Sequence, residues 1–400
     1  MSLVFQDCEK EKAKYNLAIF VIATLAYNLI ALVVNTVVGV FIPNTPIDTA
    51  LCLLVYFYLL LRALPTIIKR ITANDLIFIL ATAAVLSLSM LTGDNFGYII
   101  DALSVFPQVF LYYFLGKSIL NDDYIEKLMF KATPYVILLS FALFFFNIIF
   151  SKTQNEDNMS LAYYLLPFSI FSAFKMVRVK ENRLCNISVF IGALFLQVWT
   201  GTRGPLLCLF CALTLYILVT PNKKSTKISF ALIMACLLVF LSSNMFFDFM
   251  KNVSIFLEEK GVSNRIVDKF LQEELLDASG RDNITEKILV AIKEGPAFGY
   301  GLFGDRALLN GSYCHNIFYE LLVNFGVLIG GALFITLVIS LATSLFRTKV
   351  NSAFYTMLLC AGFIKLFLSS SYIIDPMFFM LLGALFSTGN AKKDAFYSRS

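Results

Sequence analysis

Residues 16–41 read NLAIFVIATLAYNLIALVVNTVVGVF, a run without one charged side chain. A transmembrane helix needs about 20 predominantly apolar residues, so this run is long enough to cross a bilayer. Similar runs recur along the chain of 400 residues, which is 58% hydrophobic and only 15% charged. Ordinary soluble domains are about a quarter charged. The sequence therefore predicts a membrane protein and excludes disordered, collagen-like and disulfide-scaffold classes.

The apolar runs are separated by short polar breaks, which predicts an all-α polytopic membrane protein with about 12 transmembrane helices. The expected spans are residues 16–41, 47–62, 75–91, 98–116, 133–150, 160–175, 185–200, 204–220, 227–246, 315–345, 352–369 and 372–388. They divide the chain into a first group of transmembrane helices in residues 1–246, a long external loop at 247–314 and a last group in 315–400.

Lys and Arg residues gather in alternate connections, for example at 175–183 and 223–227 and at both termini. The positive-inside rule assigns these connections to the cytoplasm, so both termini are expected to be cytoplasmic. The net charge of +5 then reflects membrane orientation and gives no reason to expect a nucleic-acid partner. The first apolar run is too long for the core of a signal peptide, so we expect it to remain in the mature chain.

The external loop is predicted to be helical. Apolar positions recur at helical spacing from Val262 to Leu276. A second helix is expected to start at Asn283, which forms a capping pair with Glu286, and to end at Gly295. Both helices are expected to lie on the membrane surface or to cap the bundle.

The loop then continues as GYGLFG at residues 299–304, which formally matches a dinucleotide-binding fingerprint. That fingerprint requires a preceding strand, and here a helix precedes it. We therefore interpret these glycines as belonging to a flexible loop.

Charged residues near the membrane are few and each requires a partner or a function. Lys365 and Asp375 flank the last outer turn at similar distances, so we expect them to form an ion pair. Glu320 and Asp101 lie close to the outer ends of their helices. Each is either a hydrogen-bonded structural carboxylate or an acceptor in a site.

Two outer helix starts are candidate functional positions. Arg203 lies in the turn TGTRGP at 200–205, where a guanidinium beside free backbone N–H groups suits phosphate oxygens. The alternative is an interfacial arginine that contacts lipid headgroups. His315, the one histidine of the chain, precedes the apolar run that begins at Ile317. The positive end of a helix dipole favours the neutral imidazole that a general base needs, although a single histidine is often structural.

Cys314 is expected to be accessible from outside, and as the one cysteine clearly on that side it has no partner there for a disulfide. A nucleophilic role would require its own base and oxyanion partners, so we do not favour one.

Several motifs in order together resemble the O-antigen polymerase and ligase superfamily. They are TGTRG at 200–204, SGR at 279–281, PAFGYG at 296–301 and HNIFYELLVNFGVLIG at 315–330. The resemblance implies a fold like that of the GT-C glycosyltransferases. It also implies an enzyme of the bacterial cytoplasmic (inner) membrane, with its active site on the outer, periplasmic face and no metal or cofactor.

Carried over by position, the resemblance assigns Arg203 and Arg281 to the diphosphate of an undecaprenyl-diphosphate-linked oligosaccharide. It assigns His315 to the acceptor hydroxyl, with Glu320, Asn316 and Asp101 as supporting residues. Guanidinium groups stabilise a departing diphosphate and a neutral imidazole can accept the proton of an attacking sugar hydroxyl, so the chemistry agrees with these roles. Direct displacement would invert the anomeric centre.

The preferred hypothesis is a polymerase that joins lipid-linked repeat units into O-antigen or capsule, possible partners being a chain-length regulator and a flippase. A ligase that transfers the glycan to lipid A-core or to a protein would use the same donor. A flippase or other transporter is an alternative of a different class. Transporters typically show paired repeats and charges near the bilayer midplane, whereas the charges here gather near the outer ends.

Overall fold

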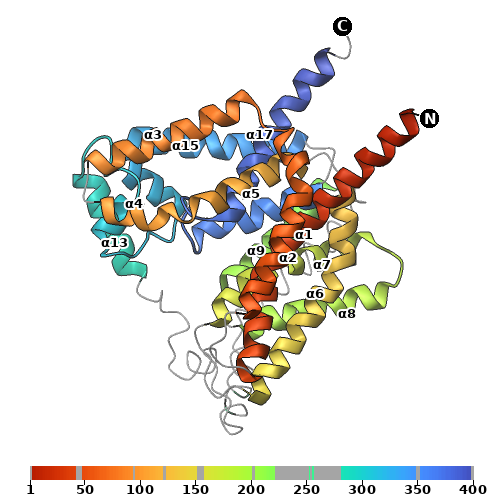
Figure 1. Cartoon of the computed structure of the whole chain (residues 1–400). Coiled ribbons are helices and arrows are strands. Elements are labelled where there is room, and N and C mark those ends of the chain that lie inside the picture. Colours follow the sequence, from red (N-terminus) through yellow and green to blue (C-terminus); the bar gives the residue numbers. More distant parts are fainter. Residues whose placement is uncertain are drawn as a thin grey trace. The chain divides into compact units, whose positions relative to one another are not determined.

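The protein is described here by a computed structural model (Figure 1). It describes residues 2–41, 47–92, 95–119, 123–150, 157–200, 203–220, 281–347 and 352–397, together with residues 252 and 255. All regular elements within these ranges are helices. The prediction of an all-α chain is therefore confirmed for the part of the chain that the structure describes.

The helices follow one another in the order α1 (Ser2–Phe41), α2 (Ile47–Ile68), α3 (Ala73–Thr92), α4 (Phe96–Leu103), α5 (Phe106–Ile119), α6 (Asp123–Phe150), α7 (Asp157–Arg178), α8 (Arg183–Trp199), α9 (Arg203–Val219), α13 (Arg281–Glu294), α14 (Gly304–Leu308), α15 (Ile317–Arg347), α16 (Ser352–Leu358) and α17 (Pro376–Tyr397). A π-helical turn (Leu359–Phe363) and a 3-10 turn (Ile364–Phe367) continue α16.

Six of the described helices are long and apolar enough to cross a membrane, namely α1, α2, α3, α6, α7 and α15. Helices α4 and α5 would form a seventh span, bent by 59° at the break between them. Four shorter apolar stretches lie in α8, in α9, at Ala353–Phe367 and at Pro376–Ser387. These helices are compatible with a polytopic membrane protein, and the total of twelve spans stays a prediction.

The predicted spans coincide with helices wherever the structure describes them. The span predicted at 227–246 and the loop helix predicted at 262–276 lie outside the described residues. Two predicted elements differ in detail. The span at 98–116 is two helices, and the loop helix predicted to start at Asn283 begins at Arg281.

The chain divides into two compact units. The first unit comprises residues 1–21, 59–126 and 278–400, and the second comprises 22–58 and 127–277. In the second unit, α6, α7 and α8 enclose an apolar core of Ile137, Phe144, Leu165, Ala193 and Leu196. Gln197 of α8 donates from Nε2 to the carbonyl oxygen of Ala162 at 3.0 Å, which joins α8 to α7 within the apolar core.

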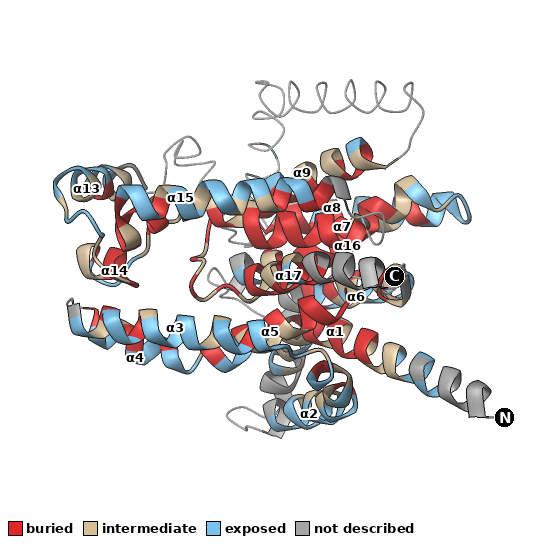
Figure 2. Ribbon diagram, turned by 90° about the horizontal axis from the view of Figure 1, so that it is seen from above, coloured by how far each residue is buried: buried red, intermediate tan, exposed pale blue. Residues whose placement is uncertain are grey.

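In the first unit, α5 and α17 pack with their backbones almost in contact. A Cβ atom on Gly116 would lie 1.8 Å from the carbonyl oxygen of Met380, and one on Gly383 would lie 1.8 Å from that of Tyr113. Small residues permit such close approach of membrane helices. By contrast, most of α3 is exposed (Figure 2), and its exposed residues include Leu76, Ile77, Leu80, Leu88 and Leu91, as expected of a helix that faces lipid.

Contacts in the first unit agree with the sidedness that the charges predict. Asn95 Nδ2 donates to the carbonyl oxygen of Tyr300 at 2.7 Å, so the connection after α3 and the loop after α13 lie at one end. At the other end, Arg70 Nη1 donates to the carbonyl oxygen of Ser118 at 2.7 Å. Which end faces the cytoplasm stays a prediction from the positive charges.

Helix α15 is not one straight rod. Gly326 has φ 76° and ψ 169°, values outside the helical region. The rings of Phe318 and Phe334 lie 4.9 Å apart, centroid to centroid, whereas sixteen residues of straight helix would separate them by about 24 Å. Residues 317–325 therefore fold back on the following part of α15, and the span predicted at 315–345 is a short arm followed by a long helix.

Candidate active site

His315 lies directly before the short arm of α15, as predicted. Asn316 Oδ1 accepts a hydrogen bond from the backbone N–H of Phe318 at 2.9 Å and so caps the helix. His315 itself has φ 55°, in the left-handed region that residues other than glycine rarely occupy. Its ring lies against that of Tyr313, with the ring centroids 4.0 Å apart and the planes inclined by 42°.

A buried charge cluster of Asp305, Arg306 and Glu320 lies beside this segment. Arg306 Nη1 donates to Asp305 Oδ1 at 2.8 Å and to Glu320 Oε1 at 3.1 Å. Both carboxylates are completely buried, and Arg306 is 6% exposed. Buried charges are retained in proteins when they are paired and hydrogen-bonded, and here one guanidinium holds two carboxylates together.

The last hairpin of the chain completes the cluster. Ser371 Oγ donates a hydrogen bond to Glu320 Oε1, and the backbone N–H of Tyr372 donates to Glu320 Oε2 at 3.3 Å. Lys365 Nζ forms the predicted ion pair with Asp375 Oδ2 in the same hairpin. Of the two interpretations of Glu320, the hydrogen-bonded structural carboxylate is therefore the one that these contacts support.

Burial and neighbouring charges shift the pKa values of Arg306 and Cys314. Burial alone would lower the pKa of Arg306, but the charges of Asp305 and Glu320 raise it overall, so the guanidinium remains charged. Burial raises the pKa of the Cys314 thiol, and the charge of Asp305 raises it further. Cys314 is therefore a protonated thiol, which argues against a nucleophilic role.

The exposure expected for Cys314 is wrong in this structure. The residue is only 6% exposed and packs in an apolar cluster with Ile288 of α13 and Val323 of α15. Its backbone N–H donates to Asp305 Oδ2 at 3.2 Å. The position in an external loop indicated exposure, but the loop folds onto α13 and α15 and buries the thiol.

The glycine-rich loop at 299–304 is hydrogen-bonded to α15, a contact that our interpretation as a flexible loop did not include. The backbone N–H groups of Tyr300 and Gly301 donate to the carbonyl oxygens of Val323 and Asn324 at 2.8 and 3.0 Å. The turn at Gly326 leaves both carbonyls without their helical partners, so the loop satisfies them. Gly299 has φ 74°, and a Cβ there would lie 2.5 Å from the backbone nitrogen of Gly326.

The other predicted site residues, Arg203, Arg281 and Asp101, lie on three different helices. Arg281 is the first residue of α13 in the first unit, and Arg203 is the first residue of α9 in the second unit. Their side chains lie outside the described part of the structure, so their convergence on His315 stays a prediction. Asp101 is exposed on α4, and its backbone carbonyl accepts from Ser104 Oγ at 3.2 Å.

Sequence reasoning missed Asp305, Arg306, Ser371 and Tyr372. A signal for the first two was present, because adjacent opposite charges occur within the otherwise apolar stretch LFGDRALL at 302–309. Such charges in apolar surroundings indicate a buried ion pair. The hairpin residues carry no comparable signal in the sequence.

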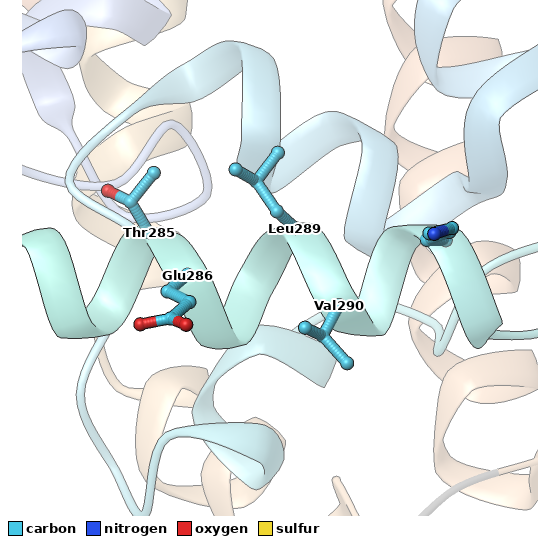
Figure 3. A pocket seen from close by; sticks show the side chains of 5 residues that line it. Thr285, Glu286, Leu289 and Val290 are labelled. Atoms are coloured by element: carbon cyan, nitrogen blue, oxygen red, sulfur yellow. The ribbon is translucent and has the colours of Figure 1, made fainter.

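A shallow hollow of about 370 Å³ lies on the outer face of α13, lined by Thr285, Glu286, Leu289, Val290 and Lys293 (Figure 3). The opposite face of the helix packs through Ile288 on the apolar cluster beneath Cys314. The hollow is therefore separate from the charge cluster. Within the described residues, no group of three or more His, Cys, Asp or Glu side chains is arranged to hold a metal ion.

One segment of the chain matches a known protein family. No curated protein and no solved structure matches the chain. Residues 188–335 match the model of the O-antigen ligase family. This segment includes His315, Asn316, both candidate arginines and the charge cluster. The match agrees with the resemblance found in the sequence, so this segment of the chain is similar to the O-antigen ligase family.

Proposed function

We propose that this membrane protein polymerises undecaprenyl-diphosphate-linked oligosaccharide repeat units into a surface polysaccharide, O-antigen or capsule, by metal-independent, inverting glycosyl transfer. The observation that carries the proposal is the position of His315. The one imidazole of the chain lies at the capped start of α15, within the segment that matches the O-antigen ligase family.

In this reaction the neutral His315 accepts the proton of the acceptor sugar hydroxyl as that oxygen attacks the anomeric carbon of the donor. The bond from that carbon to the diphosphate breaks, and negative charge develops on the departing diphosphate. Arg203 and Arg281 stabilise that charge, each as the first residue of a helix whose N-terminal N–H groups favour anions. Asn316 supports His315 by fixing the start of α15.

Glu320 supports the site indirectly. It is completely buried and ties the arm of α15 to Arg306 and to the last hairpin. Asp101 is exposed on α4 and is available for an acceptor contact. The proposal includes the inner membrane as location, cytoplasmic termini and an active site on the periplasmic face. A chain-length regulator and a flippase are the expected partners.

The second candidate function is a ligase that transfers the same glycan to lipid A-core or to a protein. The description of the matching family as O-antigen ligase favours it. Both enzymes share donor and chemistry and differ in the acceptor. A flippase, the alternative of another class, would form no covalent bond.

The test uses purified enzyme in liposomes with a defined lipid-linked repeat unit as sole substrate. A polymerase produces a ladder of longer lipid-linked products. A ligase produces no such ladder from the lipid-linked repeat unit alone. It transfers the glycan once lipid A-core is added. His315→Ala should lower turnover about 100-fold to 10,000-fold, the usual contribution of a general base, and should leave donor binding unchanged. Turnover above about a tenth of native would contradict the role of His315.

A further inference from the structure

We infer that Tyr313 is a positioning residue for His315 and that Arg306 in turn holds Tyr313 in place. The inference rests on the proposed function for its catalytic meaning, but its geometry can be tested without any activity. Arg306 contacts Tyr313 and Tyr313 contacts His315, and we call this series of contacts the Arg306–Tyr313–His315 stack.

The first contact of the stack is the one between the rings. The ring centroids of Tyr313 and His315 are 4.0 Å apart, and Tyr313 is half-buried. Since the left-handed backbone at His315 is intrinsically unfavourable, it persists only when surrounding contacts hold it. The Tyr313 ring supplies such a contact directly to the imidazole.

The second contact holds the tyrosine. The guanidinium carbon of Arg306 lies 5.7 Å from the Tyr313 ring centroid and 4.7 Å from that of Phe303. A guanidinium within about 6 Å of an aromatic ring is attracted to its face. The Tyr313 hydroxyl also accepts a hydrogen bond from the backbone N–H of Ser370 at 3.3 Å.

The third element is the backbone between the two rings. Cys314 donates its N–H to Asp305 Oδ2, the same carboxylate that binds Arg306. Consecutive residues are thus fixed in three ways: Tyr313 by its ring and hydroxyl, Cys314 by its backbone, and His315 by its ring. The buried charge cluster thus helps to orient the imidazole, because Arg306 contacts the Tyr313 ring and Asp305 binds the backbone of Cys314.

Two substitutions test the effects of the Tyr313 ring and of its hydroxyl separately. Tyr313→Phe keeps the stack and removes the bond to Ser370, whereas Tyr313→Leu removes the stack itself. Tyr319→Leu is the matched control. Tyr319 follows His315 by four residues, packs in the apolar cluster with Ile288, and has its ring centroid 5.7 Å from that of Phe318.

The direct test is spectroscopic, because the chain contains one histidine. Protein labelled with ¹³C and ¹⁵N at histidine and reconstituted in nanodiscs gives a single imidazole signal. In the native protein its ring protons should be shifted upfield from their position in denaturant, by the ring current of Tyr313. The shift should persist in Tyr313→Phe and Tyr319→Leu and should vanish in Tyr313→Leu. A native signal at the denatured position, or one unchanged in Tyr313→Leu, overturns the stack even if one variant fails to fold.

The kinetic test asks whether the stack positions the base. Misplacing a reacting group by about 1 Å costs about 100-fold, so Tyr313→Leu should lower kcat between about tenfold and about 100-fold while donor affinity stays native. Tyr313→Phe should restore most of that loss. Equal kcat in Tyr313→Leu and native enzyme, with the ring-current shift lost, would contradict positioning. If the native protein showed the ring-current shift but His315→Ala were fully active, the proposed function would be wrong, whereas the stack itself would be supported.

Discussion

The carbonyl oxygen of Ala297 lies only 2.0 Å from the position that a Cβ on Gly326 would occupy. The loop after α13 thus contacts the backbone of α15 at the residue where that helix folds back. The contact is possible only for glycine, which has no Cβ and adopts positive φ without strain. This pair therefore couples the glycine-rich loop to the arm that carries Glu320.

Gly326→Ala should destabilise the protein. A residue other than glycine at this φ costs about 1–3 kcal/mol, and the collision with Ala297 adds to it. Gly331→Ala is the control, because a Cβ on Gly331 meets nothing within 4 Å and alanine is the better helix former. Thermal unfolding in detergent measures both. Equal melting temperatures for the two variants would contradict the fold-back at Gly326.

Arg306→Met should be more destabilising than any surface change in this unit. The variant leaves two buried carboxylates without their cation, and breaking a buried pair typically costs about 3–5 kcal/mol. The control Lys287→Met removes an exposed cation from α13 and should stay within about 0.5 kcal/mol of native. Denaturant unfolding compares them, and a native midpoint for Arg306→Met would mean that the cluster is not formed.

Cys314 should resist thiol reagents in the folded protein. Maleimides react with thiolates, and burial raises the pKa of Cys314, so raising the pH to 9 should not produce labelling until the protein unfolds. A single-cysteine variant that keeps the exposed Cys185 serves as control and should label with increasing speed as the pH rises. Rapid labelling of folded protein at Cys314 would restore the exposed position that the sequence suggested.

Arg203→Lys and Arg281→Lys should each abolish most of the glycosyl transfer, because a point charge cannot replace a bidentate guanidinium on diphosphate. Arg183→Lys, an exposed substitution at the start of α8, is the control and should remain active. Initial rates with a lipid-linked repeat unit measure all three. Near-native rates in both site variants would leave these arginines as lipid-facing residues.

Saturating EDTA should leave the transfer rate unchanged, since the proposed mechanism places guanidinium groups where a metal ion would otherwise neutralise the diphosphate. The measurement is the same rate assay before and after chelation. Loss of activity that added magnesium restores would refute the metal-independent mechanism.

Hydropathy predicted the helices well because membrane-spanning helices satisfy their hydrogen bonds locally and need only a long apolar run. The ion pair between Lys365 and Asp375 was predictable for a similar reason, since both residues flank one short turn. The fold-back at Gly326 was not predictable in this way. It depends on carbonyl groups of α15 being satisfied by a loop more than twenty residues earlier in the chain, and an apolar run carries no sign of such a partner.

The same distinction between local sequence signals and long-range contacts applies to the site. The position of His315 at a helix start could be predicted from local sequence, because Asn316 caps the helix next to it. The contacts around that histidine could not, since Ser370 binds Tyr313 and Ser371 binds Glu320 only through the tertiary packing of the last hairpin. Burial of Cys314 was missed because loops of membrane proteins are usually exposed, whereas this one is packed between α13 and α15.

The fold-back of α15 also sets where the start of this helix lies along its own length. Phe318 lies beside Phe334, eight residues beyond the turn, or about 12 Å along the helix from Gly326. Residues 327–347 are about as long as the hydrocarbon core is thick, about 30 Å. The start of α15 therefore lies alongside the long part of the helix and not beyond its end. For the proposed function, we expect a donor anchored in the bilayer by its lipid to reach this position by lateral diffusion, whereas a soluble sugar nucleotide would have to leave water to do so.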